Sequence, residues 1–263
     1  MLDKFRQAKQ EEIARLREQA EAGRLPAAFK GRRPSFSAAL RSRAPRAVIA
    51  EYKRASPSRG ELNLRISPEE VALLFAGGGA AAISCLTEKR YFKGSLEFIP
   101  LMARPGLPIL RKDFLFDPLQ LVATAATPAS AALLIARMIP SINDLAAMIA
   151  RSRDLGLEPV VEVFNGADLA HAREAGADII QVNTRDLDTL DVDAGNAFRL
   201  VKDKRQGELW IAASGIKDEG DVAALEQAGY DAVLVGTALM ESRDPGRKLA
   251  ELTGHIRDGG LSL

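Results

Sequence analysis

The sequence contains one cysteine, Cys85, in 263 residues. An internal disulfide is therefore excluded. We expect this thiol, which lies in the apolar run AAISCL, to be a small buried hydrophobe in a reducing compartment. Net charge is also nearly absent, since 36 Lys and Arg residues stand against 35 Asp and Glu residues. Without a basic excess the chain lacks the electrostatic footprint of a nucleic-acid-binding protein, so no nucleic-acid partner is expected.

Long hydrophobic runs are missing as well. No stretch reaches the roughly 20 apolar residues that a membrane-spanning helix needs, and residues 1–25 are charged and lack the apolar centre of a signal peptide. We therefore expect a cytoplasmic protein with no membrane contact. The chain has no Gly-Lys-Ser/Thr of a P-loop. His171 and His255 fall in separate helical patterns, so neither a metal nor a cofactor is expected.

What the chain does contain is an alternation of short apolar runs with helical patterns. A charged amphipathic helix, marked by Leu2, Phe5, Ile13 and Leu16, comes first, and a second short helix is predicted at 35–41. Eight units of strand and helix follow. The predicted strands begin near residues 48, 81, 108, 131, 159, 178, 209 and 231, and the helices after them cover 68–76, 95–102, the segment opened by Asp117 and Pro118, 142–155, 167–175, 194–201, 218–228 and 244–256.

This alternation predicts a fold. Strands separated by helices are expected to be parallel. Eight units in 263 residues fit a closed (β/α)8 TIM barrel, with residues 1–46 as an N-terminal helical extension and residues 1–263 as a single domain. A doubly wound open sheet is the alternative, but no Gly-x-Gly-x-x-Gly follows the first strand to support it. Glycines at 77–79, 176 and 229 each follow a helix and are predicted C-caps.

In such a barrel the active site lies at the C-terminal ends of the strands. Glu51 and Lys53 share a face at the end of the first strand, because side chains alternate along a strand. Lys112 ends the third strand and Glu162 the fifth. Two lysines and two glutamates at one mouth predict acid–base chemistry, with an ordinary surface ion pair as the alternative for Glu51 and Lys53. The other charged or polar strand ends expected at this mouth are Thr87, Glu88, Arg111, Asn183 and Arg185.

The ends of the last two predicted strands carry small residues in place of charged ones. Ser214-Gly215 and Gly236-Thr237 place small residues and backbone N–H groups where a barrel commonly holds a phosphate. A phosphorylated small-molecule substrate is predicted. The alternative is that these glycines only relieve tight turns.

Several longer segments carry a resemblance to a known family. They are AEYKRASPSRG, LTEKRYFKGS, LRKDFLFDPLQ, VEVFNGADLAHAREAGADIIQVNTRDL and SGIKDEGDVAALEQAGYDAVLVGTALM. In this order, and with the N-terminal helices, they resemble the signature segments of indole-3-glycerol phosphate synthases over nearly the whole chain. The resemblance implies a carboxy-lyase of tryptophan biosynthesis. Its reaction closes the indole ring of 1-(2-carboxyphenylamino)-1-deoxyribulose 5-phosphate with loss of carbon dioxide and water.

The resemblance also implies roles for the candidate residues. Lys112 would be the general acid, with a pKa lowered by neighbouring cations and apolar surface, and Glu162 the general base. Lys53 would hold the substrate carboxylate and assist dehydration, Glu51 would orient Lys53 and the sugar hydroxyls, and Asn183 would add a polar contact. Ser214 is counted both with this catalytic group and with the phosphate ligands. The phosphate ligands would be Ser56, Arg185, Ser214, Gly215, Gly236 and Thr237, and Phe114 and Leu133 would pack on the aromatic ring unless they serve only the core.

Two positions depart from the family pattern. Ala213 stands where the family usually has glutamate, and Phe164 where it often has histidine. The first change removes a carboxylate, so two hypotheses stay open: an active synthase that works without it, or a weakly active paralogue that binds a phosphorylated metabolite. A neighbouring isomerase of the pathway is a third hypothesis, but its chemistry does not need the two lysines. We expect a monomer or weak homodimer, with other tryptophan-pathway enzymes as candidate partners.

Overall fold

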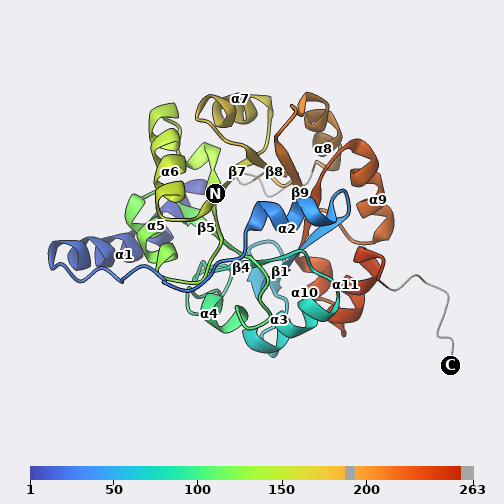
Figure 1. Cartoon of the computed structure of the whole chain (residues 1–263), viewed down its shortest axis with the longest axis horizontal. Helices are drawn as coiled ribbons and strands as arrows, with labels where there is room; N and C mark the ends of the chain where they lie inside the picture. The colour runs from blue at the N-terminus through green and yellow to red at the C-terminus, as the bar shows by residue number, and fades with distance from the viewer. Residues whose placement is uncertain (187–192, 256–263) are drawn as a thin grey trace.

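The computed structural model describes residues 1–186 and 193–255. Within these residues eight parallel strands form a closed barrel (Figure 1), and β10 pairs with β1 to close it. The predicted (β/α)8 barrel is therefore confirmed. The strands of the barrel are β1 (Ala47–Tyr52), β4 (Ala82–Leu86), β5 (Ile109–Leu115), β6 (Ala131–Ile135), β7 (Glu158–Val163), β8 (Ile179–Asn183), β9 (Leu209–Ala213) and β10 (Ala232–Val235).

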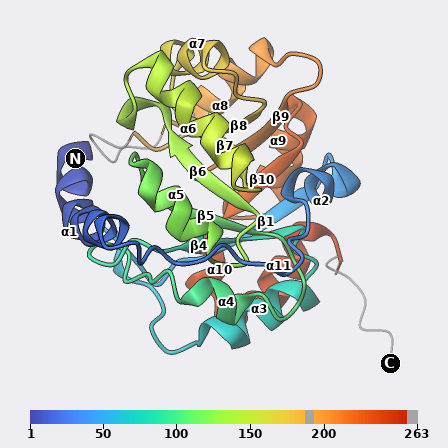
Figure 2. The ribbon, with the colours of Figure 1, turned by 60° about the vertical axis from the view of Figure 1, so that its left-hand side comes forward.

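Helices surround the barrel (Figures 1 and 2). Their starts follow from the sequence: Asp117 caps α5 through a capping box, and Pro118 occupies the first turn. Gly229 ends α9 with φ of 108°, as a C-cap glycine does. The outer helices are α3 (Pro68–Gly77), α4 (Phe98–Met102), α5 (Pro118–Ala125), α6 (Ile142–Asp154), α7 (Gly166–Glu174), α8 (Ala194–Leu200), α9 (Glu219–Ala228) and α11 (Pro245–Thr253).

Some elements were not predicted from the sequence. The predicted end of the last helix, Ile256, lies outside the described residues. The unpredicted elements are short. After barrel strands come the hairpin of β2 (Ala55–Ser56) and β3 (Gly60–Glu61), the 3-10 turn η1 (Ala136–Met138) and the helix α10 (Thr237–Met240). The 3-10 turn η2 (Val201–Asp203) follows α8.

The N-terminal extension covers two parts of the barrel. Helix α2 (Phe36–Arg43) lies over the N-terminal end of β7, where Glu158 accepts hydrogen bonds from the backbone N–H groups of Phe36 and Ser37. Helix α1 (Leu2–Glu21) packs against α5 and β5 (Figure 2). Its buried face includes Phe5 and Lys9. The extension thus reaches both ends of the barrel; its grouping with the barrel as one domain stays a prediction.

The strands are buried on both faces, as parallel barrel strands should be. Cys85 is buried in β4, and burial raises the pKa of its thiol, so it is the inert hydrophobe that the sequence predicted. None of the helices described is both long and apolar enough to span a bilayer. The described part of the chain also contains no cluster of His, Cys, Asp and Glu that could hold a metal ion.

Candidate active site

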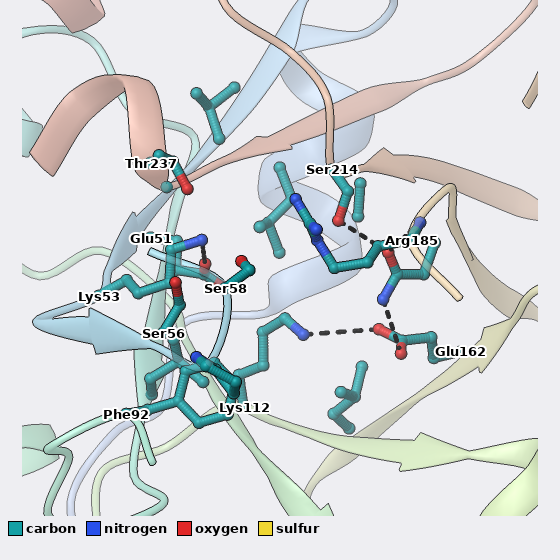
Figure 3. A pocket seen from close by; sticks show the side chains of 18 of the residues that line it. Glu51, Lys53, Ser56, Ser58, Phe92, Lys112, Glu162, Arg185, Ser214 and Thr237 are labelled. Atoms are coloured by element: carbon teal, nitrogen blue, oxygen red, sulfur yellow. Dashed lines mark hydrogen bonds and ion pairs between the residues drawn. The ribbon is translucent and has the colours of Figure 1, made fainter. Parts of the chain in front are cut away.

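A cavity of about 1000 Å³ lies at the C-terminal ends of the strands and opens to solvent. Figure 3 shows its polar side chains pointing toward one another from opposite strands. Every residue to which the family resemblance gave a role lines this cavity, although the roles themselves stay predictions. The predicted residues found there are Glu51, Lys53, Ser56, Lys112, Phe114, Leu133, Glu162, Asn183, Arg185, Ser214, Gly215, Gly236 and Thr237.

Glu51 and Lys53 lie together at the end of β1, as their shared face predicts. Lys53 Nζ is 3.4 Å from Glu51 Oε1, and Ser84 Oγ donates to Glu51 Oε2 at 3.3 Å. A Cβ atom at position 236 would overlap the Glu51 carboxylate. Glycine at 236 is therefore what allows the carboxylate to stand beside Lys53.

Lys112 and Glu162 face each other across the cavity floor, with 3.5 Å between Nζ and Oε2. Burial disfavours the charge on Lys112, but the attraction of Glu162 and Glu51 outweighs it and raises the pKa of the ammonium group. The expectation that surrounding cations lower this pKa was therefore wrong, because the closest charges are carboxylates. A raised pKa keeps Lys112 protonated at neutral pH.

A hydrogen-bonded chain connects Glu162 with the loop after β9. Asn183 Nδ2 donates to Glu162 Oε1 at 3.0 Å, and Asn183 Oδ1 accepts from Ser214 Oγ at 2.7 Å. Because Oδ1 is occupied by Ser214, the amide nitrogen must face the carboxylate. Ser214 has φ of 73° and Gly215 has φ of 81°, so the chain turns through the left-handed region here. A left-handed serine costs conformational energy, which is typical of functional sites.

The guanidinium group of Arg185 lines the cavity, and the positive charge of Arg59 acts on it. Burial and the positive charge of Arg59 lower the pKa of Arg185. Two cations held close together are stabilised when an anion binds between them. Arg59 was not predicted from the sequence, although it belongs to the segment SPSRG. Arg59 lies between β2 and β3, in the hairpin that was not predicted from the sequence.

An aromatic wall completes the cavity. The rings of Phe5 and Phe114 stack with their centroids 4.0 Å apart, and the ring of Phe92 lies 6.2 Å from that of Phe114. Phe114 and Leu133 are buried and also line the cavity, so they serve the core and the wall together. Phe5 and Phe92 are wall residues that the sequence did not predict. Phe5 had been assigned only to the apolar face of the first helix.

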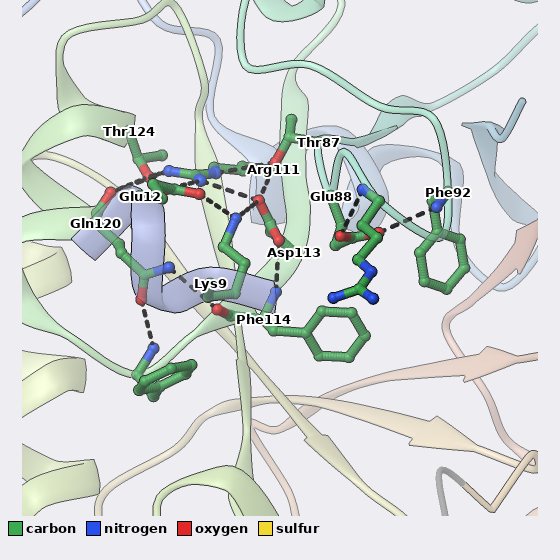
Figure 4. Close-up of polar contacts among 12 residues, drawn as sticks. Lys9, Glu12, Thr87, Glu88, Phe92, Arg111, Asp113, Phe114, Gln120 and Thr124 are labelled. Atoms are coloured by element: carbon green, nitrogen blue, oxygen red, sulfur yellow. Dashed lines mark hydrogen bonds and ion pairs between the residues drawn. The ribbon is translucent and has the colours of Figure 1, made fainter. Parts of the chain in front are cut away.

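The prediction placed Thr87, Glu88 and Arg111 at the same mouth, and this was wrong (Figure 4). Arg111 alternates with Lys112 along β5, so it points out of the barrel and is 1% exposed, with Thr87 bonded to it. Glu88 accepts the backbone N–H groups of residues 90–92 and so shapes its own loop. These side chains are structural.

Comparison with known proteins agrees with this geometry. The sequence model described as indole-3-glycerol phosphate synthase matches residues 2–252. The chain belongs to the indole-3-glycerol phosphate synthase family. A relative of that name from Carboxydothermus hydrogenoformans is 40% identical over 258 residues, which cover 95% of each chain. Indole-3-glycerol phosphate synthase 2 of Streptomyces coelicolor is 42% identical over 240 residues, covering 91% of this chain and 92% of that protein. The predicted family and its enzyme class, a carboxy-lyase of tryptophan biosynthesis, are confirmed.

Solved structures with low sequence identity share the fold alone. The structure of 3-hexulose-6-phosphate synthase from Salmonella typhimurium matches with a TM-score of 0.63 at 15% identity, covering 79% of this chain and 97% of that one. Thiamine phosphate pyrophosphorylase from Pyrococcus furiosus matches with a TM-score of 0.59 at 16% identity, covering 82% of this chain and 96% of that one.

The two departures from the indole-3-glycerol phosphate synthase pattern have different surroundings. Phe164 is not among the cavity-lining residues, and the guanidinium of Arg137 lies 4.6 Å from its ring centroid. Ala213 does line the cavity, next along the chain to Ser214 and paired with Asn183 in the sheet. Of the two departures from the family pattern, only Ala213 therefore alters the surface of the cavity.

Proposed function

We propose that this chain closes the indole ring of 1-(2-carboxyphenylamino)-1-deoxyribulose 5-phosphate, releasing carbon dioxide and water and forming indole-3-glycerol phosphate. The observation that supports this most strongly is the pair of Lys112 and Glu162, 3.5 Å apart on the floor of a cavity with cations on its rim. An acid and a base that meet in one cavity can serve successive proton transfers.

Lys112 acts first in this proposal. The aryl carbon that carries the carboxylate attacks the ketone, and the ketone oxygen gains negative charge as the new carbon–carbon bond forms. A protonated lysine can give that oxygen a proton, and its raised pKa keeps the proton available at neutral pH. Loss of carbon dioxide then removes the carboxylate from the ring carbon.

Glu162 acts in the later steps. Water leaves from the former ketone carbon, and a base must remove a proton for the indole to become aromatic. Glu162 lies beside Lys112 and accepts a hydrogen bond from Asn183, so its carboxylate is held where it can take that proton. Lys53 binds the substrate carboxylate and assists the loss of water, while Glu51 orients the Lys53 ammonium at 3.4 Å.

The substrate's two ends fix its direction in the cavity. Its phosphate binds on the side of β9 and β10, where Arg185 supplies charge and the loops supply backbone and hydroxyl donors. Its aromatic ring packs on the wall of Phe5, Phe92 and Phe114. The other phosphate ligands are Ser56, Ser214, Gly215, Gly236 and Thr237.

Turnover of the purified chain tests the proposal directly. Incubation with 1-(2-carboxyphenylamino)-1-deoxyribulose 5-phosphate should produce indole fluorescence in proportion to enzyme, with a product of the mass of indole-3-glycerol phosphate. Binding of the substrate without indole formation would reject the proposed reaction.

Glu162→Gln should lower kcat by about 10²-fold, the effect typical of losing a general base, while KM for the substrate changes little. Glutamine keeps the size of the side chain and can still pair with Asn183 through its oxygen. The comparison of kcat and KM from indole fluorescence measures both effects. A large rise in KM with unchanged kcat would assign Glu162 to binding.

Ala213 favours a second candidate, a paralogue that binds a phosphorylated metabolite and turns it over weakly. The methyl group of Ala213 cannot accept a hydrogen bond from Lys53 or from a substrate hydroxyl. If the chain is instead an active synthase, as proposed above, Ala213→Glu should raise kcat by about tenfold or more, because a pre-oriented carboxylate stabilises developing positive charge. Ala213→Gln, which has the same length and no charge, is the matched control. An equal or lower kcat in Ala213→Glu would show that the cavity has adapted to alanine.

The remaining expectations belong to the same proposal. We infer that the protein acts in the cytoplasm as a monomer or weak homodimer, and that other enzymes of tryptophan biosynthesis are its candidate partners. Size-exclusion chromatography with light scattering tests the oligomeric state.

A further inference from the structure

Gln181 on β8 lies beneath the cavity floor and is completely buried. Its amide nitrogen donates to Glu162 Oε2 at 2.5 Å. Gln181 does not line the cavity itself, so it can affect a bound substrate only through Glu162. Gln181 belongs to the quoted segment VEVFNGADLAHAREAGADIIQVNTRDL, but no role was predicted for it from the sequence.

The orientation of this amide is determined by Glu162. A carboxylate accepts hydrogen bonds and would repel the amide oxygen, so Nε2 must face Glu162 and Oε1 must point away. Gln181 Oε1 then has no hydrogen-bond partner among the described residues. A buried polar atom without a partner costs free energy, and leucine or valine would fill a barrel interior without that cost. The hydrogen bond to Glu162 is the interaction that glutamine makes here and that leucine or valine could not make.

Gln181 also affects Lys112, because both donate to the same oxygen of Glu162. Gln181 Nε2 is 2.5 Å from Oε2, whereas Lys112 Nζ is 3.5 Å away, beyond the usual 2.7–2.9 Å or so of a charge-assisted hydrogen bond. The amide therefore occupies Oε2 from below, and the ammonium is held only loosely. A loosely held ammonium can turn toward a substrate oxygen without first breaking a strong ion pair.

We propose that Gln181 is a positioning residue that fixes the carboxylate of Glu162 and keeps Lys112 from pairing tightly with it. This proposal rests on the acid and base roles given to Lys112 and Glu162 above. It assigns Gln181 no contact with the substrate.

Gln181→Met tests the proposal, because methionine has a similar length and volume but no donor. We expect kcat to fall by about 10- to 100-fold, the range that corresponds to one hydrogen bond to a charged group, with KM within about twofold of the wild type. The melting temperature should stay the same or rise, because an unpaired buried oxygen is removed. Ser130→Ala is the matched control. It also removes a buried oxygen that has no partner in the described part of the chain, at the opposite end of the barrel, and it should leave kcat unchanged.

A double-mutant cycle separates this role from a general packing effect. In a Glu162→Gln background, Gln181→Met should change kcat by less than about twofold, because the group through which it acts is already gone. An equal fall in both backgrounds, or a fall that lies mainly in KM, would overturn the proposal. If Glu162→Gln itself has no effect on kcat, the general-base assignment fails instead.

A crystal structure of Gln181→Met gives a result that does not depend on activity. The distance between Lys112 Nζ and Glu162 Oε2 should shorten from 3.5 Å to about 2.8 Å, because the ammonium no longer shares that oxygen with the Gln181 amide. An unchanged position of both side chains would show that Gln181 does not position them, even if the proposed reaction is correct.

Discussion

Replacing Lys112 with methionine should lower kcat for indole formation by about 10³-fold or more while the protein stays folded. Methionine matches the length of lysine but carries no proton, so both the general acid and its positive charge are lost. The carboxylate of Glu162 keeps its bonds from Asn183 and Gln181, so the barrel floor should remain intact. Indole fluorescence measures the rate, and circular dichroism during heating measures the fold.

Lys53→Met is the control for Lys112→Met, because it removes the other cavity lysine, which is proposed to bind the substrate. Lys53 lies at the other side of the cavity beside Glu51 and is proposed to bind the substrate carboxylate. Its loss should raise KM more than the loss of Lys112 does. If Lys112→Met retained a kcat within tenfold of the wild type, Lys112 would not be the general acid.

Asp113→Ala should reduce the free energy of unfolding by about 3 kcal/mol or more, because Lys9 and Arg111 lose a fully buried carboxylate and keep only the partly exposed carboxylate of Glu12 among the described residues. The Asp113 carboxylate accepts from Lys9 at 2.8 Å and from Arg111 at 3.0 Å (Figure 4). Glu12 of α1 pairs with the same two cations. Denaturant unfolding measures the loss. Glu219→Ala breaks the exposed ion pair with Arg46 and should cost less than about 1 kcal/mol.

The same carboxylate predicts how stability changes with pH. Burial on its own would raise the pKa of Asp113, but the charges of Lys9 and Arg111 and the hydrogen bonds from Lys9 and Thr87 lower it well below its ordinary value of 3.8. Its stabilising contribution is therefore complete above pH 3.8 and is lost as the pH falls below that value. The stability difference between wild type and Asp113→Ala should shrink in acid. A difference that stayed constant down to the lowest pH at which the protein folds would contradict this.

Asp113 also explains how β5 presents Lys112. The register between β5 and β6 shifts between Arg111 and Leu115, so this segment bulges. Bulges redirect side chains and are frequent beside active sites. Asp113 Oδ1 accepts the N–H of Phe114, and Gln120 donates to the carbonyl of Phe114, so side chains satisfy the backbone of the bulge. Helix α1 is thereby tied to the strand that carries the proposed acid.

The barrel could be predicted because each of its strands and helices is marked by residues within its own short segment of sequence. Each strand of the barrel is a short apolar run between turn residues, and most of the outer helices begin at a capping side chain, as α5 does at Asp117. The cavity residues could be predicted because strand ends in a barrel converge on one face. Position in the chain was enough to place Lys112 and Glu162 opposite each other.

The site residues that were misplaced or missed are those whose role depends on the direction of a side chain or on packing between distant segments. Arg111 and Lys112 are neighbours in sequence, yet alternation along β5 sends one outward and the other into the cavity. Phe5 enters the cavity wall only because α1 packs against β5, about a hundred residues away. Gln181 donates its hydrogen bond to Glu162, a side chain on the neighbouring strand. No pattern within a single segment contains these contacts.

A crystal structure with bound indole-3-glycerol phosphate tests the account most directly. We expect the phosphate near Arg185, Ser214 and Gly236, the indole ring against Phe5 and Phe114, and Lys112 Nζ within hydrogen-bond reach, about 3 Å, of the product or of a water beside it. A phosphate bound away from the ends of β9 and β10, or an indole ring directed away from Lys112 and Glu162, would contradict the proposed mechanism.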